Sequence, residues 1–327
     1  MPSRWLRPLV LLLVLLPAAA FADERYLIAY GGFAGFQSPI WAAKDFGLLK
    51  KYGLDAETVM VPGSTREIQA LLAGSVHFAQ VDAVTTMNAI NQGAELVMIS
   101  GSLNTFPFSF VANKEIRRPE DLNGKKIGIL GFGGANELAV LLALKEWNVP
   151  RQSVTIIQSG QAATRLIALT SRALDATVLA YPELGEATRL GMNILAHMRD
   201  MKTAAFPMNA IAVRRSFLEK NRDAVKRFQQ AYAEGTHQLL VNRDKALPML
   251  AQRMQQKNPK AVEETYQYVA PSFSFPTRIS PQGIRNTLEM VAQKAPGGKA
   301  DTSLEKYLDE STLDELDKEG FFKKFGK

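Results

Sequence analysis

The stretch YLIAYGGFAGFQSPIWAAKDFGLLKKYGLDAETVMV, residues 26–61, opens an alternating pattern of strands and helices. Residues 26–30 form a compact apolar run bounded by two glycines, which is typical of a buried strand. Ser38 can cap a helix, and the proline after it suits the first helical position, where no amide hydrogen is needed. Apolar residues then recur at helical spacing, Gly53 ends the helix, and residues 56–61 form a second apolar run. The stretch therefore predicts a strand, a helix and a strand.

The same alternation continues along the chain. We expect strands at 76–81, 95–100, 126–130, 154–158 and 176–180, and helices at 66–72, 83–91, 136–147 and 162–169. Short strands and helices that alternate at this spacing imply parallel strands joined by helical crossovers, and hence an α/β fold with doubly wound sheets. Residues 65–71 and 164–169 also resemble each other, and the pattern leaves open whether this similarity is an internal repeat or chance.

Two extended segments are expected to join two domains. Residues 103–112 are aromatic and extended, and residues 205–213 are apolar and precede a long helical pattern. Two crossings of this kind make the first domain discontinuous. We therefore expect one lobe from residues 23–105 and 208–327, with amphipathic helices in its tail, and a second lobe from residues 106–207.

The N-terminus is typical of a secretory signal peptide. Two arginines precede an unbroken apolar run at residues 9–16, and small residues lead to Ala22, where we expect cleavage. The run is shorter than the ~20 apolar residues that span a bilayer, although a plain membrane anchor is the alternative. The chain contains no cysteine, so it has neither a lipid-attachment site nor disulfides. We expect a freely soluble periplasmic protein.

Composition agrees with a globular exported protein. Removing the first 22 of the 327 residues leaves 305, which is enough for two domains. The formal net charge is +7, of which the two signal arginines account for +2, so the mature chain carries +5. Its basic residues are scattered among acidic ones, which argues against a nucleic-acid interface. A solvated mixed surface is a simpler explanation than attraction to an anionic membrane.

Three motifs together resemble a known family. They are the segment from Gln37 to Leu54 with its AAKDFGLLKKYGL core, the segment PGSTREIQALLAGSVHFA at residues 62–79, and DLNGKKIG at residues 121–128. Their order resembles periplasmic solute-binding proteins of ABC importers, in the branch that binds nitrate, taurine and alkanesulfonates and includes pyrimidine and riboflavin binders. The resemblance covers residues 24–240. It implies a two-lobe type II periplasmic binding protein fold, a small-molecule ligand, an ABC permease with its cytoplasmic ATPase as partner, a monomer, and no cofactor.

The ligand of such a fold is expected beyond the carboxyl ends of the strands, where helix N-termini present free amides and a partial positive charge. The corresponding residues here, with nearby aromatic side chains, are Phe33, Ala34, Gly35, Phe36, Gln37, Ser38, Gly63, Ser64, Thr65, Asp82, Gly131, Phe132, Gly133, Gly134, Ala135 and Tyr181.

Each of these groups also has a purely structural interpretation. Residues 63–65 supply amides and hydroxyls for an oxyanion, or cap a helix. Residues 131–134 can cradle an anionic head group, or relieve a tight turn; they lack the third glycine and the lysine of nucleotide loops. Asp82 can pair with a cationic ligand group or cap a helix. Arg66 suits an anion or a solvated helix face.

Phe33, Phe36, Phe132 and Tyr181 favour a ligand that is larger and flatter than nitrate or taurine, although core packing explains each of them equally well.

Catalysis is not expected. The three histidines are far apart in sequence and form no metal-ligand spacing, and His77 is expected to be a packed strand residue. The chain offers no cysteine nucleophile and no G-x-S-x-G elbow. Two alternatives stay open at this point: a sensing module that presents its ligand to a chemoreceptor or sensor kinase and, more distantly, an enzyme of the thiamine-pyrimidine-synthesis type.

Overall fold

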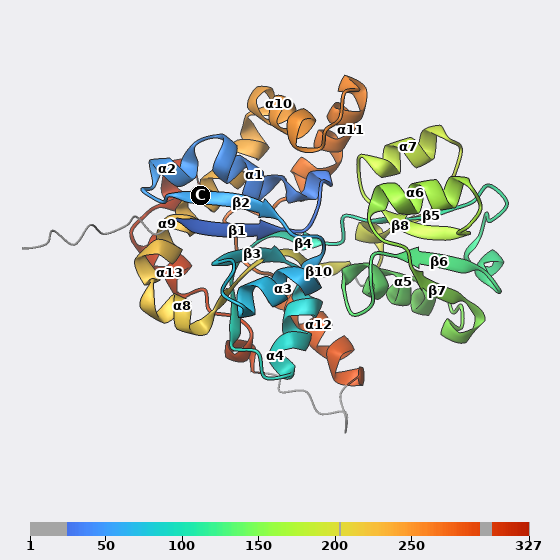
Figure 1. Ribbon diagram of the computed structural model, residues 1–327, viewed down its shortest axis with the longest axis horizontal. Helices are drawn as coiled ribbons and strands as arrows, with labels where there is room; N and C mark the ends of the chain where they lie inside the picture. Colours follow the sequence, from blue (N-terminus) through green and yellow to red (C-terminus); the bar gives the residue numbers. More distant parts are fainter. Residues whose placement is uncertain (1–24, 203, 295–302, 327) are drawn as a thin grey trace, which may run out of the picture.

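A computed structural model describes residues 25–202, 204–294 and 303–326, with side chains left out at 292–294. The described chain forms two five-stranded sheets, each flanked by helices (Figure 1). The predicted signal peptide lies outside the described residues. No helix in the described ranges is both long enough and apolar enough to cross a bilayer.

The first sheet has the strand order β2-β1-β3-β10-β4. Its strands are β1 (Tyr26–Tyr30), β2 (Ala56–Met60), β3 (Phe78–Val81), β4 (Leu96–Thr105) and β10 (Ala205–Arg214). β1 pairs in parallel with β2 and β3, as expected, but β10 lies between β3 and β4 and is antiparallel to both. The four strands predicted from the alternating pattern, β1 to β4, therefore share one direction, and β10 of the returning chain inserts among them in the opposite direction.

The second sheet has the strand order β7-β6-β8-β5-β9. Its strands are β5 (Ser109–Ala112), β6 (Lys126–Ile129), β7 (Thr155–Gln158), β8 (Ala176–Leu179) and β9 (Asn193–His197), of which β9 was not predicted. β6 is parallel to β7 and β8, whereas β5 is antiparallel to β8 and β9. This order repeats that of the first sheet, with β7, β6, β8, β5 and β9 in the places of β2, β1, β3, β10 and β4. The similar stretches at 65–71 and 164–169 therefore occupy equivalent places, after β2 and after β7.

Helices follow the parallel strands. In the first sheet they are α1 (Ser38–Asp45), α2 (Leu48–Lys51), α3 (Ser64–Leu72) and α4 (Ala83–Asn91). The single helix expected before Gly53 is broken at Gly47, which has a φ of 73°. Ser38 does not cap α1: Gln37 is the N-cap residue, and the Ser38 Oγ has no hydrogen-bond partner among the residues that the structure describes.

The second sheet carries α5 (Ala135–Glu146), α6 (Ala162–Thr170) and α7 (Glu183–Arg189). The remaining helices come from the tail and pack on the first sheet's side of the molecule (Figure 1): α8 (Arg215–Lys220), α9 (Arg222–Val241), α10 (Arg243–Arg253), α11 (Pro259–Val269), α12 (Pro281–Lys294) and α13 (Ser311–Lys318). The helix α13 is rich in acidic residues but only partly exposed. Leu313 and Leu316 are fully buried, and Glu315 pairs with Arg222 of α9 at 2.5 Å.

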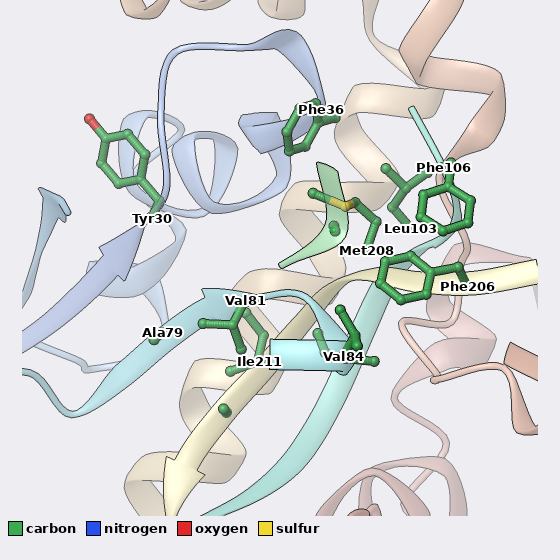
Figure 2. Packing of buried hydrophobic residues seen from close by; sticks show 14 of the residues in the cluster. Tyr30, Phe36, Ala79, Val81, Val84, Leu103, Phe106, Phe206, Met208 and Ile211 are labelled. Carbon is green, nitrogen blue, oxygen red and sulfur yellow. The ribbon is translucent and has the colours of Figure 1, made fainter. Parts of the chain in front are cut away.

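The chain passes between the sheets twice, after β4 and before β10. Beside these passages the rings of Phe106 and Phe206 stack with centroids 4.3 Å apart and planes 4° apart (Figure 2). Ala205 and Thr105 are register partners in the β10–β4 pair. The two connecting segments therefore lie side by side where the chain passes from one sheet to the other.

Candidate ligand-binding site

A cavity of about 510 Å³ lies where loops from both sheets meet. From the first sheet it is lined by the loops after β1, β2 and β3, and from the second by the loops after β6, β7 and β8. Phe108 and Met208, from the two passages, complete the wall. All six loops follow the carboxyl ends of parallel strands, where helix N-termini gather. The volume is within the range of about 300–1,000 Å³ typical of small-molecule sites.

Most residues predicted as ligand contacts line this cavity. They are Phe33, Ala34, Phe36, Gln37, Gly63, Ser64, Thr65, Asp82, Gly131, Phe132, Gly134 and Ala135. Arg66 also lines it. The structure thus brings both predicted groups, from separate lobes, to one place, while their contact with a ligand stays a prediction.

The other four predicted residues are not part of the cavity lining. The amide of Gly35 donates to the carbonyl of Tyr181 over 3.1 Å, and the Tyr181 ring packs on Tyr268 with centroids 4.9 Å apart. Ser38 is fully buried in the first turn of α1. Gly133 has a φ of 80° and donates to the carboxylate of Glu137 over 2.7 Å. Each therefore has a structural role in shaping the wall.

Asp82 is the N-cap residue of α4. Its carboxylate accepts from the Thr85 amide at 2.8 Å and from the Thr85 hydroxyl at 3.0 Å. The carboxylate also lies close to the first residues of α5 on the opposite side of the cavity, since a Cβ on Gly134 would be 4.0 Å from its Oδ2. Burial raises the pKa of Asp82, against the hydrogen bonds from Thr85, Ser64 and Ala135, which lower it. Of the two interpretations given above, capping is confirmed.

The Ser64 side chain does not cap its own helix but contacts the neighbouring loop at Asp82. Gly63, not Ser64, is the N-cap residue of α3, and no side chain caps that helix. The Ser64 Oγ instead accepts a hydrogen bond from the Asp82 amide at 3.2 Å. Gly63 has a φ of 83°, and a Cβ there would lie 3.2 Å from the side chain of Leu130, which follows β6 of the second sheet. The two sides of the cavity therefore approach closely at this point.

Glu67, one turn into α3, was missed by sequence reasoning. Its carboxyl group is fully buried, and neither oxygen has a hydrogen-bond partner within the described parts of the chain. Burial raises the pKa of Glu67 well above its ordinary value, and the negative charge of Asp82 raises it further. A Cβ on Gly31 would lie 3.0 Å from this carboxyl group, which explains why the cavity floor needs a glycine.

Arg165 and Glu183 were also missed. Arg165, in the first turn of α6, lines the cavity with a side chain that is only 4% exposed. It donates to Thr177, to the Gly160 carbonyl and to the Val178 carbonyl. Its position after β7 was a usable signal, since it matches Arg66 after β2 in the repeated pattern. The burial of Arg165 could not be predicted from the sequence, because it depends on hydrogen-bond acceptors elsewhere in the fold.

Two aromatic residues stand exposed at the cavity, one from each side. Phe33 is 42% exposed and Phe132 is 52% exposed. Exposed aromatic side chains at a concave site are typical of ligand contacts. Phe36, by contrast, is buried and meets Phe108 edge to face with centroids 6.0 Å apart, so core packing accounts for it.

The histidines occupy separate environments. His77 accepts from the Leu27 amide at 3.0 Å, His197 bonds to Ser109 at 2.7 Å, and His237 packs against Phe275 and Phe325. Across the part of the chain that the structure describes, no three His, Asp or Glu residues are grouped as metal ligands.

Two similar sheets, two connecting passages and a cavity between their strand ends define the two-lobe fold of the periplasmic binding proteins. The chain belongs to the NMT1/THI5-like family, whose model matches residues 37–246. The resemblance noted in the sequence is thereby confirmed.

Known proteins agree with this family assignment. A Brucella abortus protein whose name assigns it a provisional binding role is 28% identical over 261 residues, covering 77% of this chain and 78% of that protein. The fold is similar to the alkanesulfonate-binding protein SsuA of Xanthomonas axonopodis bound to MOPS, with a TM-score of 0.70, 20% identity and coverage of 83% and 91%. It is also similar to the nitrate-binding protein NrtA of Synechocystis, with a TM-score of 0.73, 13% identity and coverage of 91% and 89%. These relatives are solute-binding proteins.

Proposed function

We propose that this protein is the periplasmic solute-binding component of an ABC importer, and that it captures a small anionic or aromatic organic solute between two lobes. The cavity of about 510 Å³ between the two sets of strand ends is the observation that carries the proposal. Helix N-termini from both sides suit an anionic group, and Phe33 and Phe132 suit a flat apolar one.

The proposal includes the organisation of the chain. One lobe comprises residues 23–105 and 208–327, and the other comprises residues 106–207. The signal peptide is cleaved after Ala22, and the mature protein is a monomer that delivers its solute to a permease with its ATPase. Contacts of the ligand with both lobes favour the closed form, and closure requires no covalent chemistry.

A thermal-shift screen tests the binding function. The exported protein is unfolded and refolded to remove carried-over ligand, and is then screened against taurine, alkyl and aryl sulfonates, nitrate, aromatic carboxylates, pyrimidines and flavins. A solute at about 100 times its Kd should stabilise the fold by about 2.7 kcal/mol, which is readily measured. A well-folded sample that shows no shift with any compound would contradict the proposed ligand classes.

A further inference from the structure

The side of the cavity formed by the second sheet contains unsatisfied polar atoms. The Glu183 Oε2 and the Gln161 Nε2 are buried and have no hydrogen-bond partner among the described residues. Both side chains line the cavity. Buried polar atoms in folded proteins nearly always have partners, so an unpaired acceptor beside an unpaired donor in a cavity wall indicates a place for a ligand.

Arg165 lies next to both of them. Gln161 is the N-cap residue of α6, and its carbonyl accepts a hydrogen bond from the Arg165 amide over 3.0 Å. A guanidinium has five N–H donors, and three hydrogen bonds are formed here, all with uncharged acceptors at 2.5–3.0 Å. Burial lowers the pKa of Arg165 to about 10, and the charge of Glu183 opposes that change. Arg165 therefore remains a charged donor with unused capacity.

We propose that Gln161, Arg165 and Glu183 form a subsite for a planar group that carries a hydrogen-bond acceptor next to a hydrogen-bond donor, such as a primary amide or a lactam. The inference rests on the proposed solute-binding function and deepens it. The acceptor faces Arg165 and Gln161, and the donor faces Glu183. Phe33 and Phe132 at the same cavity accommodate the flat body of the ligand.

The charges on both sides of the subsite set its selectivity. A carboxylate or sulfonate satisfies Arg165 but places negative charge beside Glu183. A cationic amidine satisfies Glu183 but places positive charge beside Arg165. A neutral amide pairs with both, and a site with fixed partners rejects ligands that leave buried polar groups unpaired. Glu183 is therefore the residue that determines specificity at this subsite.

Three probes of one shape test the proposal: benzamide, benzoate and benzamidine. Calorimetric titration of the refolded exported protein should rank benzamide at least tenfold tighter than the other two. A mildly alkaline buffer is used because burial raises the pKa of Glu183 and a higher pH favours its ionised form. Benzoate or benzamidine binding as tightly as benzamide would overturn the proposal. This ranking needs no variant, so it does not depend on whether a substitution folds.

Glu183→Gln assigns the selectivity to one residue. The glutamine amide can donate to a carboxylate, so the preference for benzamide over benzoate should fall at least tenfold. Glu115→Gln changes an exposed carboxylate on the same side of the molecule and should leave the ranking unchanged. An unchanged preference in Glu183→Gln would overturn the proposal.

The outcomes also separate this inference from the proposed function. A compound of the thermal-shift panel that stabilises the protein, together with failure of all three probes to bind, would overturn the subsite and leave the solute-binding function standing. Failure of the panel and of the probes alike would overturn both.

Discussion

The Asp82 carboxylate lies beside the N-terminus of α5 across the cavity, where the backbone amide of Ala135 lowers its pKa. One carboxylate thus caps a helix on one side and occupies the positive N-terminal end of a helix on the other. Further contacts join the two sides: Gly35 donates to Tyr181, and Arg189 of α7 pairs with Glu264 of α11 at 3.0 Å. Asp82 is the most deeply buried link among these and should contribute most to the closed arrangement.

Asp82→Asn should open the molecule. Asparagine preserves the α4 cap, but it removes a negative charge beside the positive N-terminal end of α5, and such an interaction contributes about 0.3–2 kcal/mol. The radius of gyration from small-angle X-ray scattering should increase. Thr85→Ala removes a bond to Asp82 within α4 and should leave the radius unchanged. Equal radii for Asp82→Asn and the wild type would show that Asp82 does not hold the sides together.

Glu67 should make stability depend on pH. Its pKa is raised in the folded state, so the folded protein retains a proton that the unfolded chain releases. Its contribution is fully present below the unfolded pKa of about 4.3 and is lost as pH rises, by up to about 1.4 kcal/mol per pH unit, until the folded pKa is passed.

Glu67→Gln should therefore gain stability over the wild type as pH rises from acid to neutral. Urea unfolding at a series of pH values measures this difference. Glu57→Gln is a control of opposite sign, because Lys44 and Arg25 lower the pKa of Glu57 and its contribution is lost as pH falls. Parallel curves for Glu67→Gln and the wild type would mean that Glu67 is already ionised in the fold.

Gly35→Ala should destabilise the protein by about 1–3 kcal/mol through overpacking. A Cβ on Gly35 would lie 2.2 Å from the Thr265 Cγ2, whereas a Cβ on Gly32 would lie at an ordinary 3.5 Å from the Gln161 Oε1. Gly32→Ala is therefore the matched control, with a change within about 0.5 kcal/mol. Thermal unfolding of both variants measures the difference, and equal melting temperatures would refute the packing role of Gly35.

Phe33→Ala and Phe132→Ala should each weaken solute binding by about tenfold, or about 1.4 kcal/mol, because the rings are exposed at the cavity. Their stability should change by less than about 0.5 kcal/mol. Leu72→Ala removes another exposed apolar side chain, outside the cavity, and should change neither quantity. Calorimetric titration with the best compound of the screen measures affinity. Wild-type affinity in both phenylalanine variants would remove them from the site.

Local sequence patterns predicted the parts of the site that lie at strand ends. Apolar runs followed by small or capping residues located the loops at Gly63, Asp82 and Gly131, and all three loops line the cavity. The Asp82 cap follows from a rule of this local kind. The parallel pairing of β1 with its neighbours was predictable for the same reason.

Long-range pairings were not predictable in this way. No local feature indicates that β10 inserts between β3 and β4, because that pairing joins residues a hundred or more positions apart. Arg165 has the sequence context of an exposed helical residue, and its burial depends on Thr177 and the Val178 carbonyl of β8. Glu67 is likewise charged in a helix with an otherwise ordinary amphipathic pattern.

Ligand-driven closure between the lobes is the central claim, and one distance measures it. The chain has no cysteine, so Leu72→Cys on α3 and Ile167→Cys on α6 place two unique spin labels on exposed positions of helices from opposite lobes. Double electron–electron resonance on the stripped double variant should give a broad distance distribution that becomes shorter and narrower with a saturating solute. An identical distribution with and without a solute that calorimetry shows to be bound would contradict the account.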